Sequence, residues 1–206
     1  MRGLGRRLKQ RAIRDCIVKE GINFACLQET KIEKMTRHVC SNIWGDDDFE
    51  RRQSHTSNSA GGLLCIWNKE VMDVNTSFVG KGFLGVQGVL KEGNVPCFIF
   101  NIYAPCDFKE KIRLWKQVTC HKNKVNEVIW CIVGDFNTVR LLEEMMDSQN
   151  IAIGGHYMEV FNNFIHEWEV EDIPMIGRRY TWYISSSRSK SKLFRFLVSY
   201  DWLEKC

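Results

Sequence analysis

The sequence has few of the features that mark secreted or membrane proteins. Its 206 residues include only 3 prolines, and no apolar run approaches the ~18 residues of a membrane-spanning helix. Arg2, Arg6 and Arg7 are not followed by the apolar stretch of a signal peptide. We therefore expect an intracellular protein, in the nucleus or cytoplasm, that is neither secreted nor bound to a membrane.

The nine cysteines lack the spacing of a disulfide framework or a zinc site. Their number is odd and no Cys-x-x-Cys pair occurs. Several lie inside apolar runs, where cysteine behaves as a small hydrophobic residue: Cys26, Cys65, Cys97 and Cys131. Because disulfides are rare in reducing compartments, we expect a reduced protein without disulfide bonds.

Neither sign of charge dominates, since 29 basic residues face 25 acidic ones and the net charge is +4. This is an ordinary globular composition, and the length suits a single domain over residues 1–206. Basic residues nevertheless cluster near both ends: Arg2, Arg6, Arg7, Lys9, Arg11 and Arg14, then Arg178, Arg179, Arg188, Lys190, Lys192 and Arg195. Such clusters suit a phosphate backbone, the alternative being a solvated helix face and a disordered loop.

Hydrophobic periodicity predicts helices over residues 6–20, 32–44, 107–119 and 157–168. Apolar runs bounded by turn residues predict strands over residues 22–28, 61–67, 73–79, 84–90, 97–103, 128–133, 179–184 and 193–199. Gly21 stands where the first helix should end, and Asp107 is placed to cap the third. Residues 185–192 are expected to form a flexible basic loop. The order of elements predicts an α+β fold, with two sheets packed face to face between outer helices.

Polar side chains follow several of these strands, where loops gather functional groups on a rigid scaffold: Glu29, Tyr103, Asp135 and Asn137. A Glu and an Asp suffice for Mg²⁺, which takes one or two carboxylates and leaves its other positions to water and phosphate. Asn and Tyr can donate hydrogen bonds to phosphate oxygens, and an Asp can orient or deprotonate water. Spacing alone leaves open that these are solvated or capping residues.

Four short sequence motifs occur in order, each where a predicted strand ends or a loop begins: Gln28-Glu29-Thr30-Lys31, Asn101-Ile102-Tyr103-Ala104-Pro105, Gly134-Asp135-Phe136-Asn137 and Tyr180-Thr181-Trp182. Through these motifs, which are spread over essentially the whole chain, the sequence resembles the endonuclease/exonuclease/phosphatase superfamily. More closely, it is similar to the endonuclease domain of plant LINE-type (non-LTR) retrotransposons, through Arg2-Gly3-Leu4-Gly5, Gly177-Arg178-Arg179 and Leu197-Val198-Ser199.

The resemblance implies a four-layer α/β sandwich of two mixed sheets flanked by helices. It also implies a DNA-nicking phosphodiesterase that uses Mg²⁺, with Mn²⁺ as an alternative, and no small-molecule cofactor. Carried over by position, Glu29 would bind the metal, Tyr103 would contact the scissile phosphate, Asp135 would orient or activate water, and Asn137 would stabilise the transition state. DNA is the expected partner, and the expected DNA-binding residues are Arg178, Arg179, Thr181, Trp182, Arg188 and Lys190.

The sequence departs from this family in three places. The family's first-strand Asn would precede Arg2, its Ser-Asp-His loop would follow Cys206, and the acidic position of its Ser-x-Ile/Leu-Asp-Arg word is Phe194 here. None of the 5 histidines follows a Ser-Asp pair. Residues that act as a unit lose most activity when one is removed. We therefore expect a fold incomplete at both termini and a decayed, weakly active or inactive domain.

Two alternatives stay open beside this interpretation. A chain that has lost catalytic groups keeps its basic residues, so it could be a non-catalytic nucleic-acid-binding remnant. The catalytic words are shared across the superfamily, so the chain could instead be an abasic-site nuclease or a phosphoinositide or nucleotide phosphatase. The sequence leaves open whether the chain is an active enzyme.

Overall fold

A computed structural model describes residues 3–54, 61–122, 124, 128–146, 151–183 and 189–205 of the chain. The chain divides into two compact units, Met1–Tyr103 and Ala104–Cys206. The single domain expected from the sequence stays a prediction. No helix among the described residues is long and apolar enough to cross a membrane.

The first unit contains two antiparallel sets of strands. Its elements in chain order are α1 (Arg7–Glu20), β1 (Phe24–Leu27), α2 (Arg37–Trp44), β2 (Phe49–Gln53), β3 (Leu64–Asn68), β4 (Met72–Gly80), β5 (Phe83–Leu90), the 3-10 helix η1 (Glu92–Asn94) and β6 (Val95–Tyr103). Strands β1, β3 and β2 form a sheet in that order, and β5 pairs with both β4 and β6.

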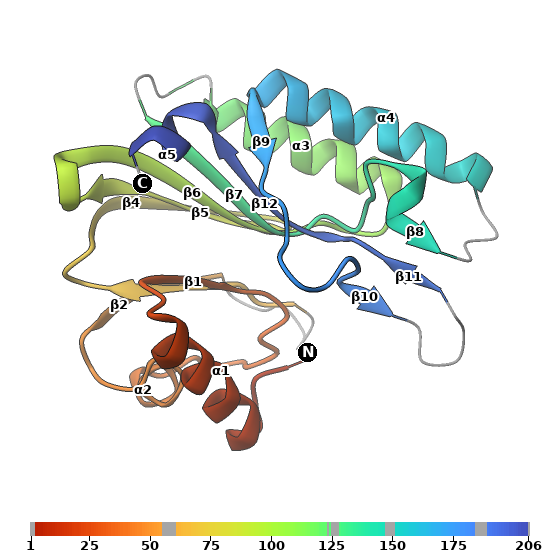
Figure 1. The fold of residues 1–206 in the computed structure, drawn as a ribbon. Helices are drawn as coiled ribbons and strands as arrows, with labels where there is room; N and C mark the ends of the chain where they lie inside the picture. The colour runs from red at the N-terminus through yellow and green to blue at the C-terminus, as the bar shows by residue number, and fades with distance from the viewer. Residues whose placement is uncertain are drawn as a thin grey trace. The chain divides into compact units, whose positions relative to one another are not determined.

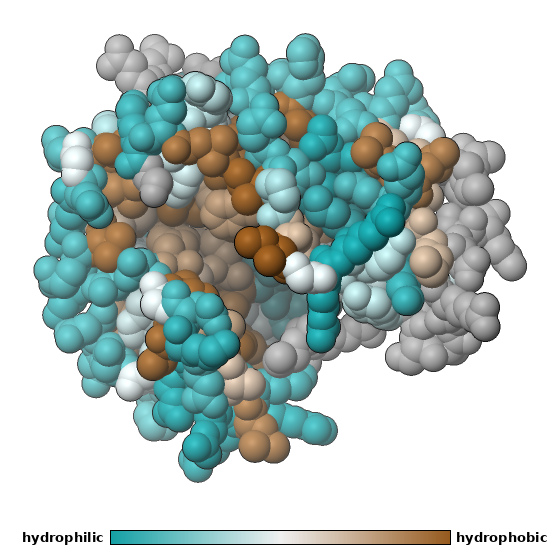
Figure 2. Space-filling view, in the orientation of Figure 1, coloured by the Kyte–Doolittle hydropathy of each residue, from teal (hydrophilic) through white to brown (hydrophobic). Residues whose placement is uncertain are grey.

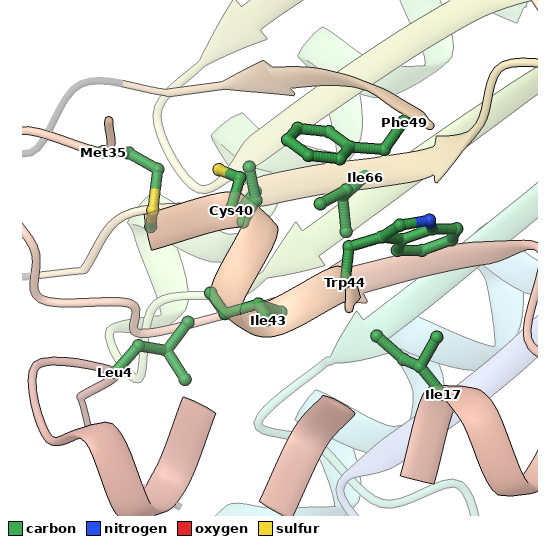
Figure 3. Close-up of a cluster of buried hydrophobic side chains, with 9 residues drawn as sticks. Leu4, Ile17, Met35, Cys40, Ile43, Trp44, Phe49 and Ile66 are labelled. Carbon is green, nitrogen blue, oxygen red and sulfur yellow. The ribbon is translucent and has the colours of Figure 1, made fainter. Parts of the chain in front are cut away.

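Helices α1 and α2 lie on one side of the β1-β3-β2 sheet (Figure 1). Gly21 ends α1 in a left-handed conformation, and the Thr36 hydroxyl caps α2 by accepting from the amide of Val39. The apolar sides of both helices meet the sheet in a buried cluster (Figure 3): Leu4, Ile17, Met35, Cys40, Ile43, Trp44, Phe49, Leu64 and Ile66. Burial of these side chains is the main stabilising contribution in this part of the unit.

The β4-β5-β6 strands approach one another closely where Gly88 of β5 faces β4. A Cβ at this glycine would lie 2.1 Å from the carbonyl oxygen of Asp73. The register of β4 against β5 shifts between Val74 and Thr76, which marks a bulge beside this contact. Glycine is therefore required at position 88 for steric reasons.

The second unit combines one set of longer strands with a small sheet. Its elements are α3 (Phe108–Lys122), β7 (Ile129–Asp135), the 3-10 helix η2 (Leu142–Glu144), β8 (Met145–Met146), α4 (Ile151–Trp168), β9 (Val170–Asp172), β10 (Trp182–Tyr183), β11 (Lys190–Ser191), β12 (Phe194–Ser199) and α5 (Tyr200–Lys205). Strand β12 pairs antiparallel with β7 and β9, and β11 pairs antiparallel with β10 and β8.

Helices α3 and α4 lie side by side in the second unit (Figure 1). Their contact is built on stacked rings, with the centroids of Trp115 and Phe164 4.6 Å apart and those of Trp115 and Phe161 5.7 Å apart. Phe136, which follows β7, joins this cluster and is fully buried. Aromatic burial thus fixes the chain just beyond the end of β7.

The α+β class predicted from the sequence is confirmed, whereas some boundaries were wrong. The helix expected over residues 32–44 begins only at Arg37, because Lys31 adopts a left-handed conformation and Met35 packs into the core from a loop. The strand expected over residues 179–184 is only Trp182–Tyr183. Lys190–Ser191 is a paired strand and not part of a flexible loop, while residues 184–188 lie outside the described residues.

The cysteines in the described residues are all free thiols. The sulfurs of Cys26 and Cys65 face each other across β1 and β3 at 3.9 Å. Cys40, Cys65, Cys97 and Cys131 are buried, so they act as small core side chains.

Candidate functional site

Glu29 lies in a tightly held loop just after β1. It is one of five non-glycine residues in the described part of the chain with a positive φ, here 49°. Backbone hydrogen bonds fix the loop from two sides, from the amides of Gly3 and Leu4 and to the carbonyls of Gly61 and Gly62. A left-handed glutamate is unusual, and such strain persists where the surroundings impose it, often at functional sites.

The carboxylate of Glu29 is accessible enough to bind a cation. Its side chain is 23% exposed, and the Nζ atom of Lys31 lies 3.8 Å from its Oε1 atom. Mg²⁺ needs only one or two protein carboxylates, so Glu29 fits as a single protein ligand. No group of three or more His, Cys, Asp or Glu side chains suited to a metal occurs within the described residues. A closed cage of protein ligands therefore does not form there.

Hydrogen bonds join the strand that precedes Glu29 to the strand that ends in Tyr103. Gln28 donates to the Oδ1 atom of Asn101 at 2.6 Å, and the Nδ2 atom of Asn101 donates to the carbonyls of Leu27 and Leu64. Asn101 is fully buried, so these bonds are shielded from water. Within the first unit, these hydrogen bonds thus connect two of the four sequence motifs, those that contain Glu29 and Tyr103.

In the second unit, Asp135 and Asn137 form one rigid turn at the end of β7. The Oδ1 atom of Asp135 accepts from the amide of Asn137 at 2.9 Å, and the amide of Ala104 donates to the Asp135 carbonyl at 2.8 Å. Asn137 has a φ of 46°, and its Nδ2 atom donates to the Ala104 carbonyl at 2.6 Å. The structure therefore brings these two predicted residues together in a fixed geometry.

Lys111 supports this turn from α3, and sequence reasoning missed it. Its Nζ atom donates to the Asn137 carbonyl at 2.7 Å and to the Thr138 hydroxyl. Only 2% of Lys111 is exposed, and this burial lowers its pKa to about 8 against the opposing attraction of Cys106 and Asp135. The available signal was a lysine one turn before Trp115 on the buried face of a predicted helix.

Phe194 lies directly opposite Asp135 in the register of β12 against β7. The resemblance expects an acidic residue at this position. Directly opposed residues of an antiparallel pair have Cβ atoms roughly 4.5–5.5 Å apart. The phenyl ring therefore occupies the neighbourhood in which a second carboxylate would have stood.

The predicted DNA-binding residues of this unit fall into different environments. Arg178, Arg179 and Trp182 are exposed, with Arg179 donating to the Glu143 carbonyl at 2.9 Å. The Thr181 hydroxyl accepts from the amides of Leu193 and Phe194, so it anchors the chain entering β12. Lys190 is half-buried and Arg188 lies outside the described residues.

Two members of the second basic cluster, Arg195 and Lys192, pair with carboxylates of the same unit and do not form a free basic surface. Arg195 is fully buried and hydrogen-bonds to both Glu144 and Asp172, and Lys192 lies 3.4 Å from an oxygen of Asp172. Burial would raise the pKa of Glu144, but hydrogen bonds from Arg195 and the Arg140 amide outweigh it and hold that pKa below its usual value. The two carboxylates thus pair with Arg195 and Lys192 inside the unit, and Arg140 also lies 3.3 Å from Asp172.

Comparisons with known proteins agree on the fold. No family model and no curated protein sequence matches the chain. Among solved structures, an AP endonuclease from Leishmania major matches with a TM-score of 0.73 and 14% identity, over 96% of this chain and 76% of that one. The 3′ phosphatase NExo from Neisseria, bound to a product DNA hairpin, matches with a TM-score of 0.74 and 13% identity, over 97% and 84%.

A third match is the endonuclease domain of TRAS1, a telomere-specific non-LTR retrotransposon. It has a TM-score of 0.67 and 10% identity, over 95% of this chain and 81% of that one. At such low identities the likeness shows the fold alone. The chain therefore has the fold of the endonuclease/exonuclease/phosphatase superfamily.

Proposed function

We propose that this chain is a Mg²⁺-dependent phosphodiesterase that nicks DNA, with weak activity, and that it derives from a retrotransposon endonuclease of the plant LINE type. The observation that carries the proposal is the rigid turn at the end of β7, where Asp135 and Asn137 are held by Ala104 and Lys111. Side chains fixed in this way suit a reaction whose catalysis depends on positioning and electrostatics.

Each residue has a role that its chemistry supports. Asp135 orients and deprotonates the attacking water, and the Asn137 amide donates to the phosphate oxygen on which negative charge develops. Tyr103 contacts the scissile phosphate through its hydroxyl. Glu29 holds Mg²⁺, which, when bound, neutralises charge on the phosphate oxygens.

The weak activity follows from Phe194. A phenyl ring opposite Asp135 adds no oxygen ligand, no charge and no hydrogen bond to the reaction. Residues that act as a unit lose activity together, so one missing carboxylate lowers the rate by orders of magnitude.

The test is nicking of supercoiled plasmid by the purified chain with Mg²⁺, alongside Asp135→Ala, Asn137→Ala and the exposed control Asp201→Ala. We expect slow nicking that stops with EDTA, falls at least about 100-fold in the two site variants and persists in the control. Nicking by the chain that equals nicking by Asp135→Ala would overturn the proposal.

The substrate class needs its own assay, because two of the matched structures are named as an AP endonuclease and a 3′ phosphatase. Abasic duplex, 3′-phosphorylated duplex and inositol phosphates are assayed beside intact plasmid. Turnover of one of these with no nicking of intact DNA would keep the hydrolase class and replace the retrotransposon assignment.

A further inference from the structure

A basic groove runs between α1 and α2 in the first unit. It has a volume of about 390 Å³ and is lined by Arg7, Leu8, Gln10, Arg11 and Arg14 of α1 and by His38 and Asn42 of α2. Among the residues that line it, none is acidic and none is Phe, Tyr or Trp. The surface over α1 mixes hydrophilic and hydrophobic residues (Figure 2).

The stability of α1 does not explain its arginines. Arg7, Arg11 and Arg14 are spaced i, i+4 and i+7, so they lie on one face and repel one another. Arg7 stands in the first turn, where the helix dipole disfavours positive charge, and this turn has no acidic residue. The arrangement opposes folding of the helix, so its explanation lies in what the arginines bind.

Little negative charge from the protein compensates the three arginines. The printed sequence has no acidic residue before Asp15. Arg14 lies 3.8 Å from Asp15, with both side chains more than a third exposed, so this pair is weak. Within the described residues, Arg7 and Arg11 are exposed and have no carboxylate within 4 Å. The groove therefore has an uncompensated positive potential that an external anion can neutralise.

We propose that the α1–α2 groove binds the sugar-phosphate backbone of a nucleic acid through Arg7, Arg11 and Arg14. From Arg7 to Arg14 the helix rises about 10 Å, at 1.5 Å per residue. This row of charge is longer than one phosphate and spans the rise of about three nucleotides at 3.4 Å each. Because no Phe, Tyr or Trp ring lines the groove and its charges are arginines, the groove recognises phosphates and not sequence. The proposal is independent of whether the chain cleaves DNA.

The test measures how affinity for a fluorescent random-sequence duplex depends on salt, by anisotropy in EDTA between 50 and 200 mM salt. Because each neutralised phosphate contributes a slope of about −0.9 in log K against log salt, Arg7→Gln/Arg11→Gln/Arg14→Gln should flatten the slope by about 2 to 3. At low salt its affinity should fall at least about 10-fold.

The matched control removes three positive charges elsewhere in the same unit: Lys19→Gln/Lys69→Gln/Lys91→Gln. Each of these lysines lies within 3.4 Å of an acidic partner and outside the groove. We expect the control variant to keep most of the slope of log K against log salt. Equal flattening by both triple variants would overturn the proposal, because it would show that only total charge matters.

A charge-preserving variant guards against misfolding of α1. Arg7→Lys/Arg11→Lys/Arg14→Lys should retain the salt slope, with an unchanged circular dichroism spectrum. Loss of the slope in this folded variant would contradict phosphate binding by point charge.

Vesicles of phosphatidylserine form a separate arm, since exposed Leu8 and Val18 on α1 could favour a membrane surface. Arginine-dependent binding to vesicles without binding to the duplex would overturn the nucleic-acid assignment.

Discussion

At the scale of single residues, Phe194 and Asp135 form the pair on which the proposed activity depends. Phe194→Asp places a second carboxylate opposite Asp135 and adds an oxygen ligand near the proposed reaction centre. We expect nicking with Mg²⁺ to rise at least about 10-fold, as one recovered member of a catalytic set would give. The control is Phe196→Asp, which lies opposite Val133 and is exposed. Equal activity of the two variants would exclude a role for position 194.

Lys111 predicts a pH dependence of stability. Burial lowers its pKa from 10.5 to about 8, so between these values the unfolded chain binds more protons than the folded chain. Stability contributed by this residue therefore rises with pH across that window, by up to about 1.4 kcal/mol per pH unit. Urea unfolding at pH 7 to 10 should show this rise, and Lys111→Met should lack it. If the unfolding free energies of the unmodified chain and of Lys111→Met changed with pH in parallel, the lowered pKa of Lys111 would be contradicted.

At the scale of elements, the buried Arg195 links β12 to η2 and β9 through Glu144 and Asp172. Arg195→Met removes the buried guanidinium that Glu144 and Asp172 share and leaves these carboxylates with Arg140 and Lys192 alone, so we expect a loss of about 3 kcal/mol in unfolding free energy. Arg113→Met, which breaks an exposed pair with Glu110, should cost below about 1 kcal/mol. Comparable losses of unfolding free energy in both variants would show that the buried network stabilises the fold no more than an exposed ion pair does.

The sequence predicted long apolar elements well and polar or short ones poorly. Strands β5, β6 and β7 are apolar enough to be read from periodicity. Strand β2 was missed because Phe49–Gln53 is an edge strand whose arginines reach the loop carbonyl of Met35 and other polar partners. β8 and β11 are two residues each, and only tertiary pairing defines them.

The candidate site shows the same division. Asp135 and Asn137 could be proposed as site residues because their motif follows a recognisable strand and resembles that of a known superfamily. Lys111 could not, because its function depends on a contact with residues 26 positions away in the sequence. Arg195 was assigned to a surface cluster for the same reason, since its carboxylate partners lie 23 and 51 positions away. Composition counts a charge, but only packing shows whether it is neutralised.

At the scale of the whole molecule, the modest net charge of +4 conceals an uneven distribution. Residues 1–14 have six basic and no acidic residues, whereas residues 104–206 have 14 of each sign. Several basic residues of the second unit are also paired internally, as Arg195 and Lys192 are. The first unit therefore dominates any long-range attraction to a polyanion.

This distribution predicts how DNA contacts respond to salt. If the chain binds DNA as proposed, contacts to α1 depend on charge, whereas contacts to β10 also use the exposed rings of Trp182 and Tyr183, since aromatic rings can stack on bases. In photo-cross-linking to single-stranded DNA without Mg²⁺, we expect cross-linked peptides from both α1 and β10 at 50 mM salt. Raising salt to 200 mM should remove the α1 peptides first, since counterion release weakens purely ionic contacts most. Loss of the β10 peptides before the α1 peptides would show that α1 has contacts beyond its charge.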